Sequence, residues 1–124
     1  METNYVMKYD DARVIYYAIL LIVDRLSSRD DSERLVAIGK ECFAFTISYD
    51  GKRRSLSVAI EPRLLKEILQ GINDLLLNVY AAAHLHVNVN AKIPGTPYPL
   101  GNLGDLLPVM RENQTRIEKI FAEN

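Results

Sequence analysis

The sequence predicts a single α+β domain, in which a small antiparallel sheet of three or four strands packs against three main helices. Apolar and polar residues alternate on both sides of Asp50-Gly51, a pattern typical of a central β-hairpin. After Pro62, apolar residues recur at intervals of three and four, which predicts a long helix. The chain has 124 residues and no internal repeat, so we expect one domain over residues 1–124.

The first predicted helix begins at Asp10 or Asp11, whose carboxylate can cap it, and continues to about Ser27. Within it, Val14–Val23 is a run of ten apolar residues that covers nearly all sides of the helix. A surface helix normally shows one apolar stripe, and a small domain offers few neighbours to cover the rest. We therefore expect a homo-oligomer that assembles through Val14–Val23, with complete burial inside one chain as the alternative.

The middle of the chain is predicted to be mainly β-structure. Ser27–Glu33 is a polar break, Leu35–Ile38 is a candidate short strand, and Gly39-Lys40 is a candidate bend. The hairpin follows, and alternation places one set of side chains on its buried face. That set is Phe43, Phe45, Ile47 and Tyr49 on the first strand, and Leu56, Val58 and Ile60 on the second.

The second half combines two helices with one more strand. The Pro62 helix should reach about Ala82, and Gly71 in its middle weakens it by about 1 kcal/mol unless a close backbone contact needs the space. His84–Asn90 alternates as a strand with a polar face, and the Pro- and Gly-rich residues 91–104 form a loop. A final helix is capped by Asp105, with Pro108 tolerated in its first turn.

These patterns predict a core drawn from every element of the chain. Its members are Ile15, Ala18, Ile22, Phe43, Phe45, Ile47, Val58, Ile60, Leu65, Ile68, Leu69, Ile72, Leu76, Val87, Ile117 and Phe121.

Composition excludes several classes of partner. The formal net charge of -1 provides no global field to bind DNA or RNA polymers. The longest apolar run is too short for a bilayer, which takes roughly 20 residues, so no membrane association is expected. Cys42 is the only cysteine, which excludes an internal disulfide and favours a reducing compartment, so a cytoplasmic location is expected.

Known catalytic motifs are absent from the sequence, and no cofactor or metal is predicted. Cys42 lies next to no activating group and is interpreted as a buried apolar residue. His84 and His86 would share one face of a strand, but a third metal ligand is missing nearby. They are candidates for hydrogen bonding to a ligand, with a structural or surface role as the alternative, and His86 could serve as a general base.

A dispersed set of polar and aromatic residues could bind a small nucleotide. Arginine forms bidentate bonds with phosphate, tyrosine can stack on a base, and asparagine can bond to base or ribose edges. Each also has a simpler interpretation, as a solvated hairpin tip, a core residue or a solvated helix face. The candidate ligand-binding residues are Tyr80, His84, His86, Asn88, Asn90, Tyr98, Arg111, Arg116 and Arg54, the last in the basic triplet 52–54.

The order and approximate spacing of Tyr80, Asn90 and Arg111 resembles that of small phage Thoeris anti-defence proteins, which sequester cyclic ADP-ribose-type signals. The resemblance implies an oligomeric sponge in the host cytoplasm that binds a signalling nucleotide without cleaving it. It implies that Tyr80 stacks on adenine, Asn90 contacts polar edges, and Arg111 contacts the phosphates. Arg116 would be a second phosphate contact, although a spacing of five does not place it on the same helical face as Arg111.

The expected function is therefore non-catalytic sequestration of a small, anionic, nucleotide-type ligand by a homo-oligomer. A second hypothesis is an immunity, inhibitor or assembly protein that acts through a protein interface. It is favoured by the small size and the apolar first helix. A third hypothesis is an enzyme built around His84 and His86.

Overall fold

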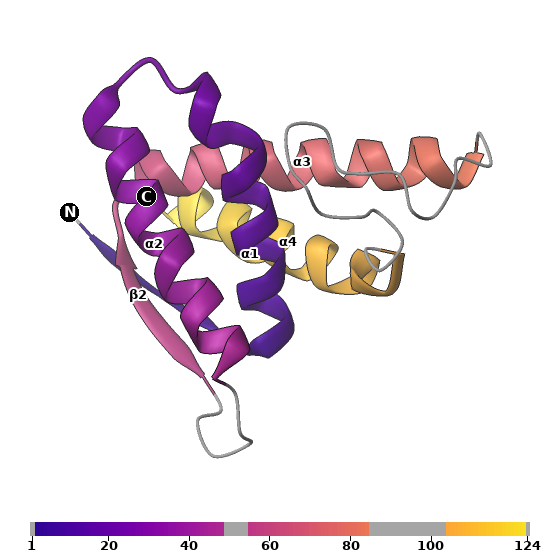
Figure 1. Ribbon diagram of the computed structural model, residues 1–124, viewed down its shortest axis with the longest axis horizontal. Helices are drawn as coiled ribbons and strands as arrows, with labels where there is room; N and C mark the ends of the chain where they lie inside the picture. The colour runs from indigo at the N-terminus through magenta and orange to yellow at the C-terminus, as the bar shows by residue number, and fades with distance from the viewer. Residues whose placement is uncertain (1, 49–54, 85–103, 124) are drawn as a thin grey trace.

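The computed structural model describes residues 2–48, 55–84 and 104–123, with side chains left out at 82–84. The chain is α+β, and four helices form most of it (Figure 1). Short 3₁₀ turns lie at Val23–Arg25 and Gly104–Leu106. In chain order the elements are β1 (Thr3–Met7), α1 (Tyr9–Ile22), α2 (Arg29–Ile47), β2 (Leu56–Ile60), α3 (Pro62–His84) and α4 (Leu107–Glu123).

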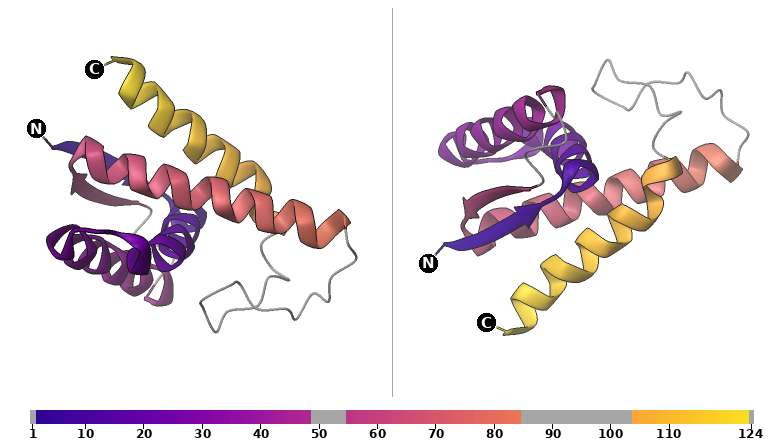
Figure 2. Two further views of the ribbon diagram at one scale, coloured as in Figure 1. Left: turned by 90° about the horizontal axis from the view of Figure 1, so that it is seen from above. Right: turned by 90° about the horizontal axis from the view of Figure 1, so that it is seen from below.

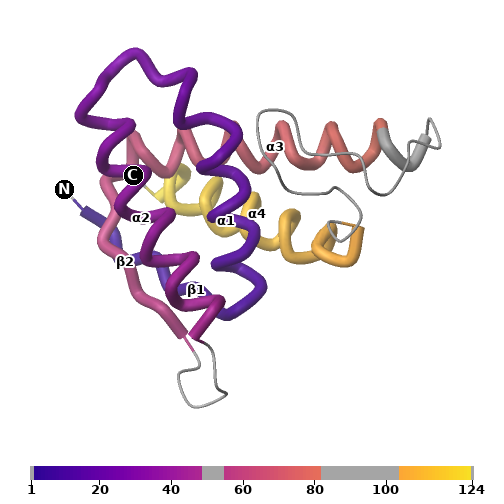
Figure 3. Tube along the Cα trace, in the orientation of Figure 1, coloured from indigo at the N-terminus to yellow at the C-terminus, as the bar shows by residue number. Residues whose placement is uncertain are grey.

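Within the described residues the sheet has two antiparallel strands, β1 and β2, and not the three or four that were predicted (Figure 3). Thr3 pairs with Ile60, Tyr5 with Val58, and Met7 with Leu56. The side chains of these paired residues lie in the core, except that of Thr3, which is partly buried. The residues between them on each strand face outward. Leu56–Ile60 is thus a half-buried strand as predicted, but its partner is the N-terminal strand, which the sequence reading missed.

The predicted hairpin is wrong, because its first strand belongs to α2. The predicted strand Leu35–Ile38 and the bend at Gly39-Lys40 lie in the same helix. The Oγ of Ser28 caps the helix by accepting a bond from the amide of Asp31 at 3.4 Å. The buried residues recur at helical intervals, which overrides the local alternation after Cys42. They are Leu35, Ile38, Gly39, Cys42 and Phe45.

Helix α1 is buried by the chain's own elements. It packs against α2, α3, α4 and β1, and Figure 2, seen from above, shows α3 running between α4 and the α1–α2 pair. The buried apolar side chains in Val14–Val23 are Val14, Ile15, Ala18, Ile19, Leu21 and Ile22. The apolar run therefore supplies no reason to expect a second subunit at this helix.

Gly71 allows α1 and α3 to approach closely. A Cβ atom built at this position would lie 2.5 Å from the carbonyl oxygen of Ala18, far inside a van der Waals contact. This is the close backbone contact that would justify a glycine in the middle of a helix. The helix containing it runs to His84 and so takes in the first residue of the predicted strand His84–Asn90. The rest of that strand lies outside the described residues.

Most of the predicted core is confirmed. The buried members are Ile15, Ala18, Ile22, Phe45, Val58, Ile60, Leu65, Ile68, Ile72, Leu76 and Ile117. Leu69 and Phe121 are partly buried, and Val87 lies outside the described residues. The prediction that Phe43 and Ile47 are buried is wrong, because their side chains are 42% and 69% exposed. On a strand they would share the face of Phe45, but on a helix residues two apart point in different directions.

The final helix follows the prediction in its main features. Asp105 lies in the 3₁₀ turn just before α4, and Pro108 is in the first turn of the helix, where its missing N–H costs no hydrogen bond. No helix in the described part of the chain combines the length and apolar character needed to cross a membrane.

Replacing Gly71 with Ala tests the close contact. We expect the free energy of unfolding to fall by roughly 1 to 3 kcal/mol, because the overlap with Ala18 outweighs the higher helix propensity of alanine. Gly39→Ala is the matched control, since its Cβ would meet Ile19 Cγ2 at an ordinary 3.5 Å, and it should stabilise by about 0.5 to 1 kcal/mol. Urea denaturation measures both; equal effects would contradict the packing of α1 on α3.

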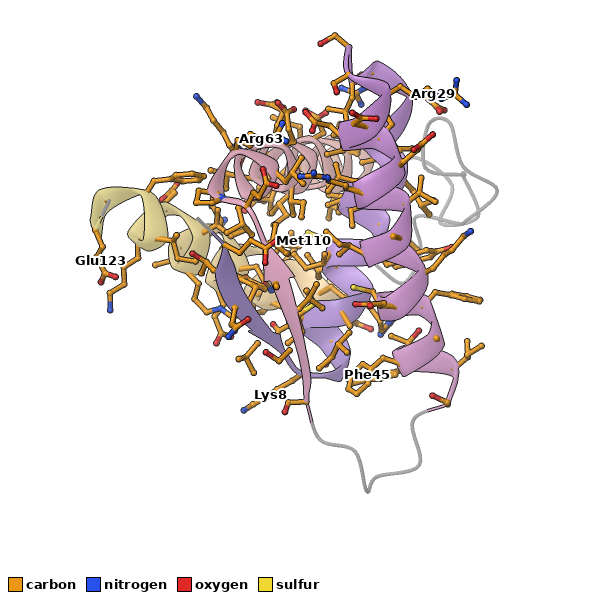
Figure 4. All side chains as sticks on the ribbon, turned by 90° about the vertical axis from the view of Figure 1, so that its left-hand side faces the viewer. Lys8, Arg29, Phe45, Arg63, Met110 and Glu123 are labelled. Carbon is orange, nitrogen blue, oxygen red and sulfur yellow. The ribbon has the colours of Figure 1, made fainter. Side chains whose placement is uncertain are left out.

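A pair of phenylalanine substitutions separates a helix from a strand in this region. Phe45 lies on the side of α2 that faces the sheet (Figure 4), so Phe45→Ala should destabilise by about 3 to 5 kcal/mol. Phe43→Ala should cost only about 1 kcal/mol, because that ring is 42% exposed and packs on Tyr16 with 5.3 Å between the ring centres. Comparable losses of unfolding free energy in urea denaturation would support the hairpin instead, because both rings would then share a buried face.

Candidate functional site

Tyr80 of α3 and Arg111 of α4 meet at the surface where these two helices pack. The helices are also joined by a hydrogen bond of 2.6 Å from Gln114 Nε2 to Asn73 Oδ1. The guanidinium carbon of Arg111 lies 5.6 Å from the centre of the Tyr80 ring, within the range of a cation–π contact. Tyr80 is 42% exposed and Arg111 is exposed, so the pair faces solvent.

Arg111 differs from the other arginines that the structure describes, because no carboxylate of the described residues pairs with it. Each of the others has a carboxylate oxygen within 4 Å of a guanidinium nitrogen. Those pairs are Arg13–Asp10, Arg25–Asp74, Arg29–Glu33, Arg34–Glu61, Arg63 with Asp31 and Glu61, and Arg116–Asp11. Within the described residues, Arg111 is therefore the guanidinium whose charge is left for another group to neutralise.

Exposed guanidinium and ring together suit a planar, anionic ligand. The fork of Arg111 can bond a phosphate or carboxylate with two parallel bonds, and the ring of Tyr80 has a face on which a base can stack. His84 ends α3 four residues after Tyr80, so its backbone lies one turn further along the same helix. The sequence reading named all three residues, and the structure brings Tyr80 and Arg111 into contact.

Arg116 lies elsewhere. Five helical positions amount to a rotation of about 140° beyond a full turn, so it leaves α4 in a different direction from Arg111. Its Nη1 is 3.5 Å from Asp11 Oδ2, and its guanidinium carbon is 4.5 Å from the centre of the Tyr5 ring. The structure thus separates the two arginines that the resemblance assigned to phosphate.

A buried polar cluster holds Arg116 in that position. Tyr5 Oη donates to Asn113 Oδ1 at 2.5 Å, and Asn113 Nδ2 donates to Asp11 Oδ1 at 2.9 Å. Asp11 also accepts from the Lys8 amide at 2.9 Å. Within the described residues no buried side-chain N or O atom lacks a partner. A fully paired network of this kind joins β1, α1 and α4, and its groups are committed to structure.

The sequence could not have identified this cluster from local pattern. Tyr5 and Asn113 are 108 positions apart, and Asp11 and Asn113 are 102 apart. The local sequence marks Asp11 only as a helix-capping residue. The one available signal was Asn113 on the apolar side of the last helix, four residues before Ile117.

Two buried groups have raised pKa values. Burial raises the pKa of Tyr5 to about 12, although the charge of Arg116 acts in the opposite direction. Burial also raises the pKa of the Cys42 thiol to about 12, so the sulfur remains protonated at neutral pH. A buried, protonated thiol is a poor nucleophile, which agrees with the interpretation of Cys42 as an apolar core residue.

The other predicted ligand-binding residues lie outside the part of the chain that the structure describes. These are Arg54, His86, Asn88, Asn90 and Tyr98. His84 is the last residue of α3, so it does not lie on a strand face that it could share with His86. Among the described residues, no three of the side chains that commonly ligate metals are clustered.

A hollow of about 720 Å³ lies away from Tyr80 and Arg111, at the connection between α1 and α2. Val23, Leu26 and Val36 supply its apolar lining, and its charged groups include the Arg29–Glu33 pair at 3.1 Å. Because these charges compensate each other, the hollow shows no preference for an anion or a cation. None of the residues predicted to bind a ligand lines it.

Comparisons with models of protein families, with curated proteins and with solved structures find no match for this chain.

Tyr5→Phe tests the polar cluster through its pH dependence. The unfolded chain releases the Tyr5 proton near pH 10 and the folded chain only near pH 12, so the tyrosine makes stability fall as pH rises through this window. The variant should lose about 1 to 3 kcal/mol at neutral pH, because Asn113 loses a donor, and should decline less between pH 10 and 12. Urea denaturation at several pH values measures both effects. Tyr9→Phe is the control, and parallel wild-type and Tyr5→Phe profiles would contradict the assignment.

Proposed function

We propose that this protein binds a small, anionic, nucleotide-type ligand without transforming it, at a surface centred on Tyr80 and Arg111. The observation that carries the proposal is the position of Arg111. It lies 5.6 Å above an exposed tyrosine ring, and no carboxylate among the described residues pairs with it. A phosphate would supply that missing negative charge, and the ring offers a stacking surface for the base.

The proposal needs binding groups and no reactive centre. The cationic fork and the aromatic face can both act in recognition, while the thiol of Cys42 is buried. Both residues lie on regular helices, α3 and α4, that pack together, so their backbone positions are set before a ligand binds, which favours affinity. The likeness to Thoeris anti-defence proteins supports a cyclic ADP-ribose-type ligand through Tyr80 and Arg111. The likeness does not extend to Arg116 as a phosphate contact, because Arg116 is already paired with Asp11.

A protein-binding function is the second candidate, and a specific feature of α2 favours it. Val36, Phe43 and Ile47 form a stripe of partly exposed apolar side chains along one side of this helix, next to α1, where Phe43 also packs on Tyr16. Exposed apolar stripes of this kind are typical of protein interfaces. An immunity, inhibitor or assembly protein would use this stripe.

Arg111→Ala and Tyr80→Ala test the proposed ligand site. The protein is incubated with cyclic ADP-ribose-type compounds, ADP-ribose and cyclic dinucleotides. Thermal shift then measures binding, and mass spectrometry identifies what heating releases. We expect intact ligand, a loss of affinity of about tenfold to a hundredfold for Arg111→Ala, and about tenfold or more for Tyr80→Ala. Tyr80→Phe should retain most of the affinity, because it keeps the stacking face.

Arg29→Ala is the matched control, because Arg29 is an exposed helix arginine already paired with Glu33. It should bind as the wild type does. A chemically altered product would identify an enzyme instead. The absence of a thermal shift with every nucleotide would contradict the proposal and favour the protein-binding function.

A further inference from the structure

The outer edge of β1 carries backbone groups that do not bond to β2. The ladder runs from Thr3 to Met7, and no backbone hydrogen bond joins the residues just beyond its ends. Thr3, Tyr5 and Met7 are therefore the residues that exchange hydrogen bonds with β2, and the N–H and C=O groups of Asn4 and Val6 point to the opposite edge. An edge of this kind is a template for another strand.

A groove runs along this edge, between β1 and the last turns of α4. Its volume is about 390 Å³. Arg116 Nη2 donates to the carbonyl oxygen of Val6 at 2.9 Å, which shows that α4 lies on the side of β1 away from β2. Figure 4 shows α4, which ends at Glu123, beside the sheet. The lining residues on which the inference rests are Asn4, Val6, Arg116, Lys119, Ile120 and Glu123.

We propose that this groove binds an extended acidic peptide segment of a partner protein, which adds to β1 as a third strand. The main chain of the segment would bond to the outward groups of Asn4 and to the Val6 amide. Ile120 and the half-exposed side chain of Val6 provide apolar contact. Strand addition between an edge strand and a helix is an established way to recognise a peptide, and main-chain bonds supply much of the affinity.

Charge favours an acidic segment. The helix side of the groove carries two cations, Arg116 and Lys119, and one carboxylate, Glu123. Lys119 and Glu123 are 4.0 Å apart with side chains 74% and 68% exposed, so their pairing is weak and Lys119 remains available. Asp11 neutralises part of the charge of Arg116 from inside the fold. A carboxylate on the incoming strand, from a side chain or from a C-terminus, would complement Lys119.

The position of α4 favours a single peptide segment over a second copy of this chain. Two copies paired edge to edge through β1 would each bring an α4 helix to the same place, because Arg116 attaches α4 to that edge. One extended strand needs only the width of a strand spacing, about 5 Å. The groove therefore suits a segment without its own helix at the edge.

Peptide titration followed by NMR tests the proposal. The probe is a capped peptide of alternating threonine and valine with a central glutamate, compared with the same peptide carrying lysine. We expect saturable shifts at the amides of Asn4 and Val6, and tighter binding of the glutamate peptide. A peptide with a free C-terminal carboxylate and no glutamate distinguishes a terminal from a side-chain carboxylate. Methylation of the peptide's backbone nitrogens should weaken binding by about tenfold or more.

Val6→Pro removes the outward N–H and leaves the bonds between β1 and β2 in place. It should therefore lower the affinity for the glutamate peptide by about tenfold. Val6→Ala keeps the N–H and is its matched control. Lys119→Glu should reverse the preference between the glutamate and lysine peptides, while Lys66→Glu, an exposed residue of α3, should not.

Three results would overturn the proposal. They are the absence of shifts at β1 with every peptide, equal binding of the N-methylated peptide, and a dimer in light scattering whose contacts protect the Asn4 and Val6 amides. The N-methylated peptide tests the main-chain hydrogen bonds to β1 with the wild-type protein, so the test does not depend on whether Val6→Pro folds. None of these outcomes depends on Tyr80 or Arg111.

Discussion

The close approach of α1 and α3 at Gly71 is the contact on which the rest of the fold depends. A side chain there would overlap the carbonyl of Ala18, so glycine lets the two backbones pack with almost no space between them. The contact places α1 in the interior, where α2, α3, α4 and β1 can cover its apolar residues. It also places α3 so that its second half continues beyond the body of the domain (Figure 1) and presents Tyr80 to α4.

The buried polar cluster fixes α4 in the same way that Gly71 fixes α3. Tyr5 and Asp11 both bond to Asn113, and removing any one of the three would take a hydrogen bond from a buried group. Because Arg116 belongs to this cluster, Arg111 is directed away from it and toward Tyr80. One helix thus carries an arginine paired with Asp11 and an arginine that no described carboxylate pairs, and the difference between them comes from their angular separation along α4.

Local pattern predicted the helices better than the sheet. Three of the four helices have strong boundary signals: Asp10 and Asp11 in the first turn of α1, Pro62 at the start of α3, and Pro108 in the first turn of α4. Lys8, and not either aspartate, is the N-cap residue of α1, so the helix begins slightly earlier than predicted. Helix α2 was misread because alternation from Cys42 to Ile47 imitates a strand over a few residues. Its helical period appears only when Leu35 and Ile38 are read together with Cys42 and Phe45. A short window cannot distinguish the two periods when both fit.

The sequence by itself determined the positions of three of the four helices, which residues are apolar enough for the core, and that Tyr80 carries an aromatic ring and Arg111 a cationic fork. These are local properties, since propensity, capping and hydropathy depend on neighbouring residues. Tertiary structure decided that β1 pairs with β2, that Arg116 pairs with Asp11 while Arg111 has no carboxylate partner in the described part of the chain, and that the edge of β1 borders a groove. These features depend on contacts between residues far apart in the sequence, such as the hydrogen bond between Tyr5 and Asn113. No local stretch of sequence contains both partners of such a contact.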